Sequence, residues 1–433
     1  MSDQLQSVRG MNDLLEEQLP LWRRLERCVC DLFHEYGYRE LRVPLVERTA
    51  LFRRSIGEHT DIVEKEMYSF EDRGGESLSL RPEATAGLVR AAIEHGLLHN
   101  QKQRFWTAGA MFRHERPQQG RYRQFHQVDC EAFGFEGPDV DAEMILMSAR
   151  LWRKLGLAGV GLAVNSLGTP ASRAAYREQL VGHFRRHAAA LDDDSRRRLE
   201  TNPLRILDSR NPALRGLIDD APRLTDHLDD DSRRHFEDFR ALLDACGVPY
   251  RVEPRLVRGL DYYTRTVFEW TSGALGAQDA VCSGGRYDGL VEQLGGEPTP
   301  AIGWALGIER VIGLMQSAGI DAPAAAPAVY LVLAGPRAEC AGIALAEQLR
   351  DALPGTGVLV HMGGGGLKAQ MKRADKSGAE IAVILGEDEA TRGVAAVKRL
   401  RGGQPQREHT WDRLPAELAA LLGGGRMMES GNG

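Results

Sequence analysis

The chain has 433 residues, of which 42% are hydrophobic and 27% are charged, as in globular proteins. This length exceeds what one ordinary hydrophobic core accommodates, so we expect about two or three domains. The net charge of -6 excludes a protein that is basic throughout, and any contact with nucleic acid must use local basic patches.

The first predicted elements are a helix and a strand. Residues 21–36 form the helix, and Gly37 ends it. Its apolar side chains recur at helical spacing: Leu21, Leu25, Val29, Leu32 and Phe33. Residues 38–47 alternate as a strand that contains Pro44. Because proline cannot donate to a strand ladder, Pro44 predicts an edge or interface position.

A strand, a helix and a long hairpin follow between residues 77 and 135. Strand 77–80 is predicted to stop at Pro82, which holds Glu83 at its end. A helix then begins at Thr85 and ends near Gly96. The hairpin consists of strands 104–112 and 123–135, with an arginine-rich loop at 113–122 between them.

Alternation along strand 123–135 predicts an unusually polar face. This face carries Phe125, Gln127, Asp129 and Glu131, and the other face carries His126, Val128, Cys130 and Ala132. The nearby loop arginines suit phosphate contact, because guanidinium groups bind phosphate through two hydrogen bonds. The alternative is an exposed charged hairpin.

The amino-acid composition changes after a predicted strand at 160–167. From about residue 171 to 246, helical runs rich in Arg, Asp and Leu predict a helical insertion. Strands resume near Tyr250. A helix begins at residues 308–310, where its first turn favours anions near Arg310.

The last quarter of the chain alternates between strands and helices. An Ala/Pro-rich linker at 321–327 precedes a β-α-β-α-β pattern over 329–385, which predicts a small parallel α/β domain. Helix 367–377 carries three lysines on one stripe, Lys368, Lys372 and Lys376, opposite Leu367, Met371 and Ala374. The lysines suit contact with RNA, and a solvated face is the alternative. The Gly-rich tail, 423–433, is predicted to be disordered.

Several stretches resemble one enzyme family in the order in which that family carries them. Residues 113–116 and 124–131 resemble motif 2 of the class II aminoacyl-tRNA synthetases, and 125–131 resemble the histidyl-tRNA synthetase family. Two further signatures of this family resemble residues 258–270 and 283–289. Class II motif 3 resembles residues 301–310. A small departure is Ala84, where the family more often has glycine.

The resemblance implies a fold and a domain order. It implies an α+β catalytic domain at 1–320, with a class II antiparallel sheet flanked by helices and a helical insertion at about 171–246. The linker at 321–327 would lead to a C-terminal α/β anticodon-binding domain at 328–422. The segment around Pro44 resembles motif 1, which implies a homodimer interface.

The implied reaction joins histidine to tRNA-His through histidyl-adenylate. The family pattern assigns ATP, with Mg²⁺ on its outer phosphates, to Arg113, Glu115, Arg121, Phe125 and Arg310. Arg113 and Arg258 would be catalytic at the α-phosphate, where Arg258 takes the place of a metal ion used by other class II enzymes. We therefore expect no metal site built by the protein itself.

The same pattern assigns histidine and tRNA contacts. Histidine would be bound by Glu83, Thr85 and Gln127 at its ammonium group, by Glu131 and Tyr263 at its imidazole, by Tyr262 and Tyr287 as pocket walls, and by Arg258 at its carboxylate. The loop at 113–122 resembles the bacterial form, in which Arg116 and Gln118 would meet the extra 5′ guanosine of tRNA-His. Lys368, Lys372 and Lys376 would contact tRNA elsewhere.

Two other functions share this fold. One is the regulatory paralogue, a subunit of ATP phosphoribosyltransferase, and the other is a non-catalytic RNA-binding module. The paralogue generally lacks the anticodon domain and the catalytic arginines, whereas this chain keeps Arg113, Arg258, Arg310 and residues 328–422.

The cellular location is predicted from cysteines and apolar segments. The six cysteines are scattered and form no Cys-x-x-Cys pair, which favours a reducing compartment. The sequence shows neither an apolar signal segment at its start nor a stretch long enough to span a membrane. We therefore expect a cytoplasmic protein.

Overall fold

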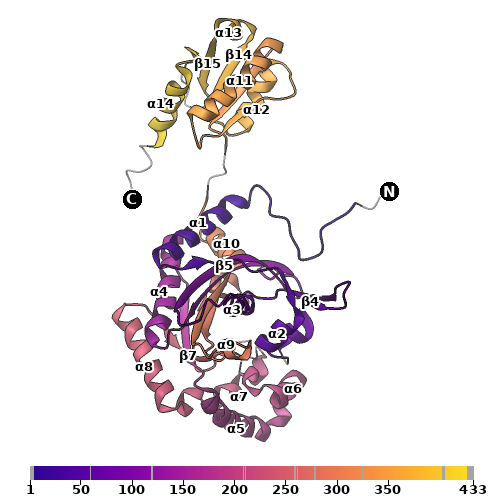
Figure 1. The fold of residues 1–433 in the computed structure, drawn as a ribbon, viewed down its shortest axis with the longest axis vertical. Coiled ribbons are helices and arrows are strands. Elements are labelled where there is room, and N and C mark those ends of the chain that lie inside the picture. The colour runs from indigo at the N-terminus through magenta and orange to yellow at the C-terminus, as the bar shows by residue number, and fades with distance from the viewer. Residues whose placement is uncertain are drawn as a thin grey trace. The chain divides into compact units, whose positions relative to one another are not determined.

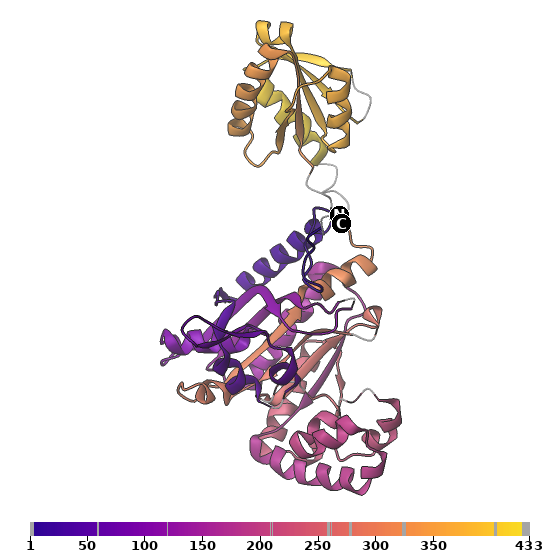
Figure 2. The ribbon, with the colours of Figure 1, turned by 90° about the vertical axis from the view of Figure 1, so that its right-hand side faces the viewer.

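The computed structural model describes residues 4–58, 60–118, 120–207, 209, 211–257, 260, 262–276, 279–322, 326–401 and 405–426. The chain divides into two compact units, Met1–Ala322 and Pro323–Gly433 (Figures 1 and 2). Within the described ranges, none of the helices is long and apolar enough to cross a membrane.

The first unit is built on an eight-stranded sheet in the order β1-β5-β6-β11-β10-β9-β7-β8. The strands are β1 (Arg39–Glu40), β5 (Gln103–Phe112), β6 (Gln124–Phe133), β7 (Gly161–Ser166), β8 (Arg251–Val252), β9 (Thr264–Thr271), β10 (Ala280–Arg286) and β11 (Ala301–Gly307). All pairs between β5 and β7 are antiparallel, and only the edge strands β1 and β8 pair in parallel. The predicted antiparallel sheet is thus confirmed.

Helices α1 (Leu19–Glu35), α4 (Pro138–Leu155), α8 (Asp230–Ala245) and α10 (Ile308–Ser317) pack together with one face of this sheet (Figure 1). The predicted apolar stripe of α1 is buried along its whole length. Phe33 of this stripe stacks on Trp106 of β5 at 4.9 Å and on Trp304 of β11 at 5.7 Å between ring centroids. Removing such a buried ring costs about 3–5 kcal/mol, so the stripe anchors α1 to the sheet.

The other face meets α3 (Thr85–Glu94), α9 (Leu290–Gln293) and the insertion helices α5 (Pro170–Arg186), α6 (Asp193–Thr201) and α7 (Arg215–Asp219). The predicted helical insertion is confirmed as helical. Its last helix differs from the others, because Phe236 and Phe239 of α8 join the core on the α4 side. The helix therefore belongs to the layer that supports the sheet.

The predicted strand 38–47 is wrong, because two short strands in different sheets take its place. Strand β1 joins the large sheet, while β2 (Val46–Arg48) pairs with β4 (Ser77–Leu80) in a three-stranded sheet completed by β3 (Ser69–Glu71). Pro44 lies between them and has no N–H for a ladder. The Arg81 side chain also donates to the carbonyl of Val43 at 3.1 Å. This bond gives the carbonyl beside Pro44 a side-chain partner in place of a neighbouring strand.

The second unit contains a five-stranded sheet in the order β13-β12-β14-β15-β16. Its strands are β12 (Val329–Ala334), β13 (Val358–Val360), β14 (Ile381–Gly386), β15 (Val394–Arg399) and β16 (Arg407–Thr410), and its helices are α11 (Pro336–Ala352), α12 (Leu367–Lys376), α13 (Glu387–Arg392) and α14 (Leu414–Arg426). The three predicted strands are parallel, as expected. The other two were not predicted, and they pair antiparallel, so the sheet is mixed.

The end of the chain differs from its prediction. Helix α14 continues to Arg426, four residues beyond Leu422, where the sequence predicts disorder to begin. Residues 427–433 lie outside the described residues.

Candidate active site

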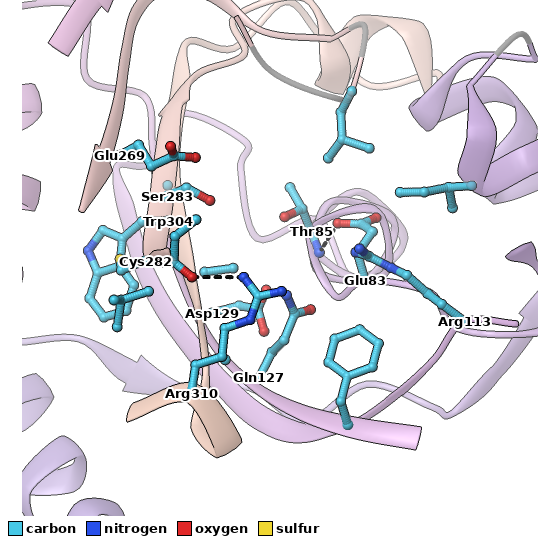
Figure 3. A pocket seen from close by; sticks show the side chains of 18 of the residues that line it. Glu83, Thr85, Arg113, Gln127, Asp129, Glu269, Cys282, Ser283, Trp304 and Arg310 are labelled. Atoms are coloured by element: carbon cyan, nitrogen blue, oxygen red, sulfur yellow. Dashed lines mark hydrogen bonds between the residues drawn. The ribbon is translucent and has the colours of Figure 1, made fainter. Parts of the chain in front are cut away.

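A cavity of about 270 Å³ lies where β6, β10 and β11 face the first turn of α3 (Figure 3). The structure brings together, around this cavity, nearly all residues assigned to histidine and ATP: Glu83, Thr85, Arg113, Glu115, Arg121, Phe125, Gln127, Glu131, Tyr262, Tyr263, Tyr287 and Arg310. Arg258 lies outside the described residues.

The floor of the cavity comes from β6 and its neighbour β11. The alternation predicted for β6 is confirmed, since Phe125, Gln127, Asp129 and Glu131 all line the cavity. Strand β11 places Gly303, Ala305 and Gly307 opposite Glu131, Asp129 and Gln127, respectively. A Cβ atom on Gly303 would collide with the Glu131 carboxylate. The small residues of β11 therefore leave room for the polar side chains of β6.

Glu83 is held by the start of α3. One carboxylate oxygen accepts the backbone N–H of Thr85 at 2.8 Å, and the other accepts that of Ala86 at 2.9 Å. These N–H groups have no partner within the helix, and the helix dipole favours a negative charge there. Burial raises the pKa of Glu83, while the bonds to α3 and the charge of Arg113 oppose the rise. Pro82 and α3 together fix this carboxylate at the cavity wall.

Glu131 is fixed by two hydroxyl groups. Its carboxylate oxygens accept hydrogen bonds from Thr85 Oγ1 at 2.8 Å and from the Tyr287 hydroxyl at 2.5 Å. Burial raises the pKa of Glu131 well above the usual range, although both hydroxyl bonds oppose the rise. Tyr262 packs against Tyr263 and Tyr287, with ring centroids 4.7 and 5.5 Å apart, and these rings form an aromatic wall beside Glu131.

Arg113 lines the cavity beside Glu83. Its Nε donates to the carbonyl of Pro82 at 2.9 Å, and its guanidinium carbon lies 5.2 Å from the centroid of the Phe125 ring. A cation and an aromatic ring are therefore neighbours, as binding of a nucleotide's phosphates and base would require.

Helix α10 is tied to β10, to the loop 113–122 and to β6. Arg310 Nη1 donates to the carbonyl of Ala280 at 2.7 Å, and its Nε donates to that of Gly120 at 3.1 Å in the loop 113–122. The Glu309 carboxylate accepts the backbone N–H of His126 at 3.0 Å and lies 2.9 Å from its ring Nδ1. Sequence reasoning assigned no role to Glu309, since its contact depends on the pairing of β6 with β11.

Arg121 and Glu115 contact each other at the cavity rim. They form an ion pair, and a second carboxylate, that of Glu66, lies 3.8 Å from Arg121. The two residues assigned to ATP thus neutralise each other in this structure.

The residues assigned to tRNA lie outside the cavity. Arg116 and Gln118 are exposed on the loop, and Lys368, Lys372 and Lys376 are exposed on α12 of the second unit. The opposite face of α12 buries Ala374 as predicted, but Leu367 is 45% exposed. Gln370 is buried instead, and it exchanges hydrogen bonds with the backbone of Leu333.

Asp129 is the main cavity residue to which the sequence assigned no role. Its side chain is only 1% exposed, and neither carboxylate oxygen has a hydrogen-bond partner among the described residues. Alternation placed it on the cavity face, but its lack of partners depends on which side chains surround it. The described residues also contain no group of three or more His, Cys, Asp or Glu side chains arranged to hold a metal ion.

Comparison with known proteins assigns both units. The family model for histidyl-tRNA synthetase matches residues 10–311, and that for an anticodon binding domain matches residues 329–421. The histidine–tRNA ligase of Halorhodospira halophila is 58% identical over 419 residues, which are 97% of this chain and 99% of that protein.

Solved structures agree with these matches. The apo histidyl-tRNA synthetase of S. aureus superposes with a TM-score of 0.81 at 35% identity, over 96% of this chain and 100% of that one. The histidyl-tRNA synthetase of Nostoc sp. PCC 7120 has a TM-score of 0.69 at 21% identity, over 97% and 100% of the two chains, and shows the fold alone.

The large antiparallel sheet, the cavity on it and the separate C-terminal domain define a class II aminoacyl-tRNA synthetase. Within that class, the chain belongs to the histidyl-tRNA synthetase family.

Proposed function

We propose that this chain activates L-histidine with ATP and transfers it to the 3′ end of tRNA-His. The observation that carries the proposal is a cavity that is lined both by buried carboxylates and hydroxyls and by arginines and an aromatic ring. The carboxylates and hydroxyls suit an amino acid with an ammonium group and ring nitrogens, and the arginines with the aromatic ring suit a nucleotide.

Histidine is proposed to lie between α3 and the floor of the sheet. Glu83, Thr85 and Gln127 hold its ammonium group, while Glu131 and Tyr263 meet its imidazole, with Tyr262 and Tyr287 as walls. The hydroxyls that fix Glu131 support this placement, because they preset the direction of its remaining lone pairs. A site built to pair ring nitrogens rejects side chains without them, because its own polar groups would be left unpaired.

ATP enters as its Mg²⁺ complex. Phe125 stacks on the adenine with Glu115 beside it, Arg113 holds the α-phosphate, and Arg121 and Arg310 hold the outer phosphates. A histidine carboxylate oxygen attacks the α-phosphorus, a new P–O bond forms, and the bond to the pyrophosphate oxygen breaks. This step moves no proton, so it depends on positioning and on the arginine charges. By family resemblance Arg258 adds a further cation there.

In the second step the 3′-terminal ribose hydroxyl attacks the carbonyl carbon of the adenylate. A new C–O bond forms, the bond from that carbon to the AMP phosphate oxygen breaks, and the hydroxyl proton is released to solvent. Arg116 and Gln118, exposed on the loop, are proposed to meet the acceptor end. The lysines of α12 would contact tRNA from the anticodon-binding domain. We place this activity in the cytoplasm.

We also propose that the chain is a homodimer that pairs through the three-stranded sheet. Register places Val46 beside Leu80, and both Phe70 and Arg48 beside Leu78, so four apolar side chains and Arg48 share one face. Val46 is 38% exposed and Phe70 is 46% exposed, whereas Ser79 on the opposite face is buried. An apolar face turned outward marks an interaction surface, and a second copy of the chain is the partner that the motif 1 resemblance implies.

Phe70→Asp tests this interface. A buried, unpaired charge in a dimer core should convert the dimer to a monomer and lower adenylate formation. Sedimentation measures the mass. The control is Leu359→Asp, since Leu359 is 45% exposed but lies in the other unit. The interface is elsewhere if both variants keep the mass of the unmodified protein.

Histidine-dependent exchange of pyrophosphate into ATP tests the activation step. We expect exchange with histidine and none with glutamine or tyrosine. A regulatory subunit or an RNA-binding module would show no exchange with any amino acid. Exchange of similar size with glutamine or tyrosine would contradict the proposed pocket chemistry.

A further inference from the structure

The floor of the cavity contains buried acceptor atoms that the protein itself does not satisfy. Both oxygens of Asp129 and the Oε1 atom of Gln127 are buried and have no hydrogen-bond partner among the described residues. Burying a carboxylate without a partner is costly, and such groups are normally paired. A ligand that brings several donors would remove this cost.

Asp129 belongs to the wall of the cavity, although its side chain is buried. It lies on β6 between Gln127 and Glu131, and it lines the cavity beside Gln127 (Figure 3). Glu131 lines the same cavity. Its neighbours across the strands are Ala305 on β11 and Thr107 on β5, which have short side chains. Glu83 lines the same cavity from α3.

The nearby cations do not neutralise Asp129. Arg81 donates to the carbonyls of Val43 and Ala110, and Arg113 donates to that of Pro82. Burial and the like charge of Glu83 together raise the pKa of Asp129 well above its usual range, although Arg81 and Arg113 oppose the rise. Two buried carboxylates therefore share this part of the cavity, and within the described part of the chain neither arginine donates a hydrogen bond to Asp129.

Thr85 connects this site to Glu131. Its hydroxyl donates to Glu131 at 2.8 Å, and its oxygen keeps lone pairs that can accept from an ammonium group. Within the described ranges, the unpaired oxygens of Gln127 and Asp129 are further open acceptors on the floor.

We propose that Asp129 binds the α-ammonium group of histidine, together with Glu83 and Gln127. The proposal rests on the proposed function and adds a ligand to its amino-acid site. An ammonium group has three N–H donors, and these three side chains offer one acceptor each. Two carboxylates facing one cation would also make the site select amino acids with a free, charged amino group.

The test compares two inhibitors of histidine-dependent pyrophosphate exchange. Histidinol keeps the imidazole and the ammonium group, whereas imidazolepropionate keeps the imidazole and lacks the ammonium group. Asp129→Asn preserves the shape of the side chain and removes its charge. We expect the inhibition constant of histidinol to rise about 10-fold to 100-fold, as for loss of a hydrogen bond to a charged group, and that of imidazolepropionate to stay unchanged.

The ratio of the two inhibition constants distinguishes a change in ligand binding from a folding defect. Both inhibitors are measured on one preparation, so a loss of folded protein leaves the ratio unchanged. The same ratio is also measured for Asp129→Ser, which has a shorter, uncharged side chain. Glu136→Gln, which alters an exposed carboxylate just beyond β6, removes the same charge and should not change the ratio.

The outcomes separate this inference from the proposed function. An equal rise for both inhibitors would mean that Asp129 only shapes the pocket, and no rise for either would mean that it does not touch the ligand; both results overturn the inference. If the unmodified protein shows no histidine-dependent exchange, the proposed function fails instead.

Discussion

At the scale of single residues, the cavity concentrates buried carboxylates that are stabilised in different ways. Glu83 accepts two backbone N–H groups of α3, and Glu131 accepts two hydroxyls. Asp129 has neither kind of partner among the described residues. Because unpaired buried acceptors are rare, the difference singles out Asp129 as the carboxylate whose partner is a ligand.

Glu131→Gln tests the imidazole end of the cavity. The change keeps the shape of the side chain but removes the charge and replaces one acceptor oxygen with a donor. We expect the KM for histidine in pyrophosphate exchange to rise about 10-fold or more, because a charge-assisted hydrogen bond is lost. The KM for ATP should stay near that of the unmodified protein. An unchanged KM for histidine would remove Glu131 from the histidine site.

The candidate site could be predicted from the sequence only in part. Alternation on β6 and the break at Pro82 indicated which side chains point toward a ligand. Alternation could not reveal that Gly303 lies against Glu131, or that Glu309 binds the backbone of His126, because both contacts depend on β11 lying beside β6. Arg258, a central residue of the family pattern, stays a prediction.

At the scale of elements, a buried ion cluster connects α4, α8 and β10. Asp141 of α4 lies 2.8 Å from Arg286 of β10 and 2.7 Å from His235 of α8. Arg286 also donates to the carbonyl of Phe135 at 3.0 Å. Tyr287, which contacts Glu131, follows Arg286 directly in the chain, so the cluster positions the cavity wall from behind.

Asp141→Asn should lower the stability of the first unit by about 3–5 kcal/mol at neutral pH, because it leaves Arg286 buried without its main charge partner. Burial alone would raise the pKa of Asp141, but Arg286 and His235 outweigh it and hold the pKa below the usual range. The stabilisation that the charged Asp141 carboxylate contributes is therefore present above the unfolded-state pKa of about 3.9. It is lost as the pH falls through the lower folded-state pKa.

Urea denaturation across this pH range measures the effect. The free energy of unfolding of Asp141→Asn should lie below that of the unmodified protein by the whole expected amount at neutral pH. This difference should become smaller in acid. Asp139→Asn, an exposed change in the first turn of the same helix, is the control. If the two variants lose the same stability at neutral pH, the cluster does not stabilise the fold.

The loop from Arg113 to Tyr122 is an element fixed at several points. Gln118 and Arg121 exchange backbone hydrogen bonds of 3.0 and 2.9 Å, and Gly120 between them has a φ of +71°. The carbonyl of Gly120 accepts from Arg310. The loop therefore presents the exposed Gln118 side chain on a defined turn.

Gln118→Ala should impair charging of tRNA-His while leaving pyrophosphate exchange near that of the unmodified protein, because the side chain lies outside the cavity. It should also reduce the penalty for deleting the extra 5′ guanosine of the tRNA, since the two changes remove one contact. Gln316→Ala, an exposed change on α10, is the matched control. If the variant and the deletion act independently, the loop does not read this nucleotide.

The elements themselves were predictable where local periodicity decided them. The apolar stripe of α1 and the lysine stripe of α12 follow from spacing alone. Spacing alone does not predict the division of 38–47 into two strands, the antiparallel strands β15 and β16, or the packing of α8 against α4. In each of these cases the outcome depends on partners distant in sequence, which local patterns do not specify.

At the scale of the whole molecule, the chain consists of two units with separate cores, and the family models match them separately. We predict that residues 1–322 alone still form histidyl-adenylate if they dimerise, but charge tRNA-His poorly. Exchange and charging assays on this fragment measure both activities. Full charging by the fragment would show that the second unit is not needed to bind tRNA.

The full-length chain offers a finer test of the second unit. Replacing Lys368, Lys372 and Lys376 with alanine should weaken tRNA binding and reduce its salt dependence, because fewer phosphate contacts release counterions. Exchange should not change, since these lysines belong to the other unit.

The most direct test of the central claim is charging of tRNA-His, followed by mass measurement of its 3′-terminal nucleoside. With histidine, ATP and Mg²⁺, we predict that the full-length chain esterifies histidine to the terminal adenosine and releases one AMP and one pyrophosphate per charged tRNA. Omitting ATP or histidine should abolish the product. A terminal adenosine that stays unmodified with all substrates present, or that carries another amino acid when a mixture is supplied, would contradict the account.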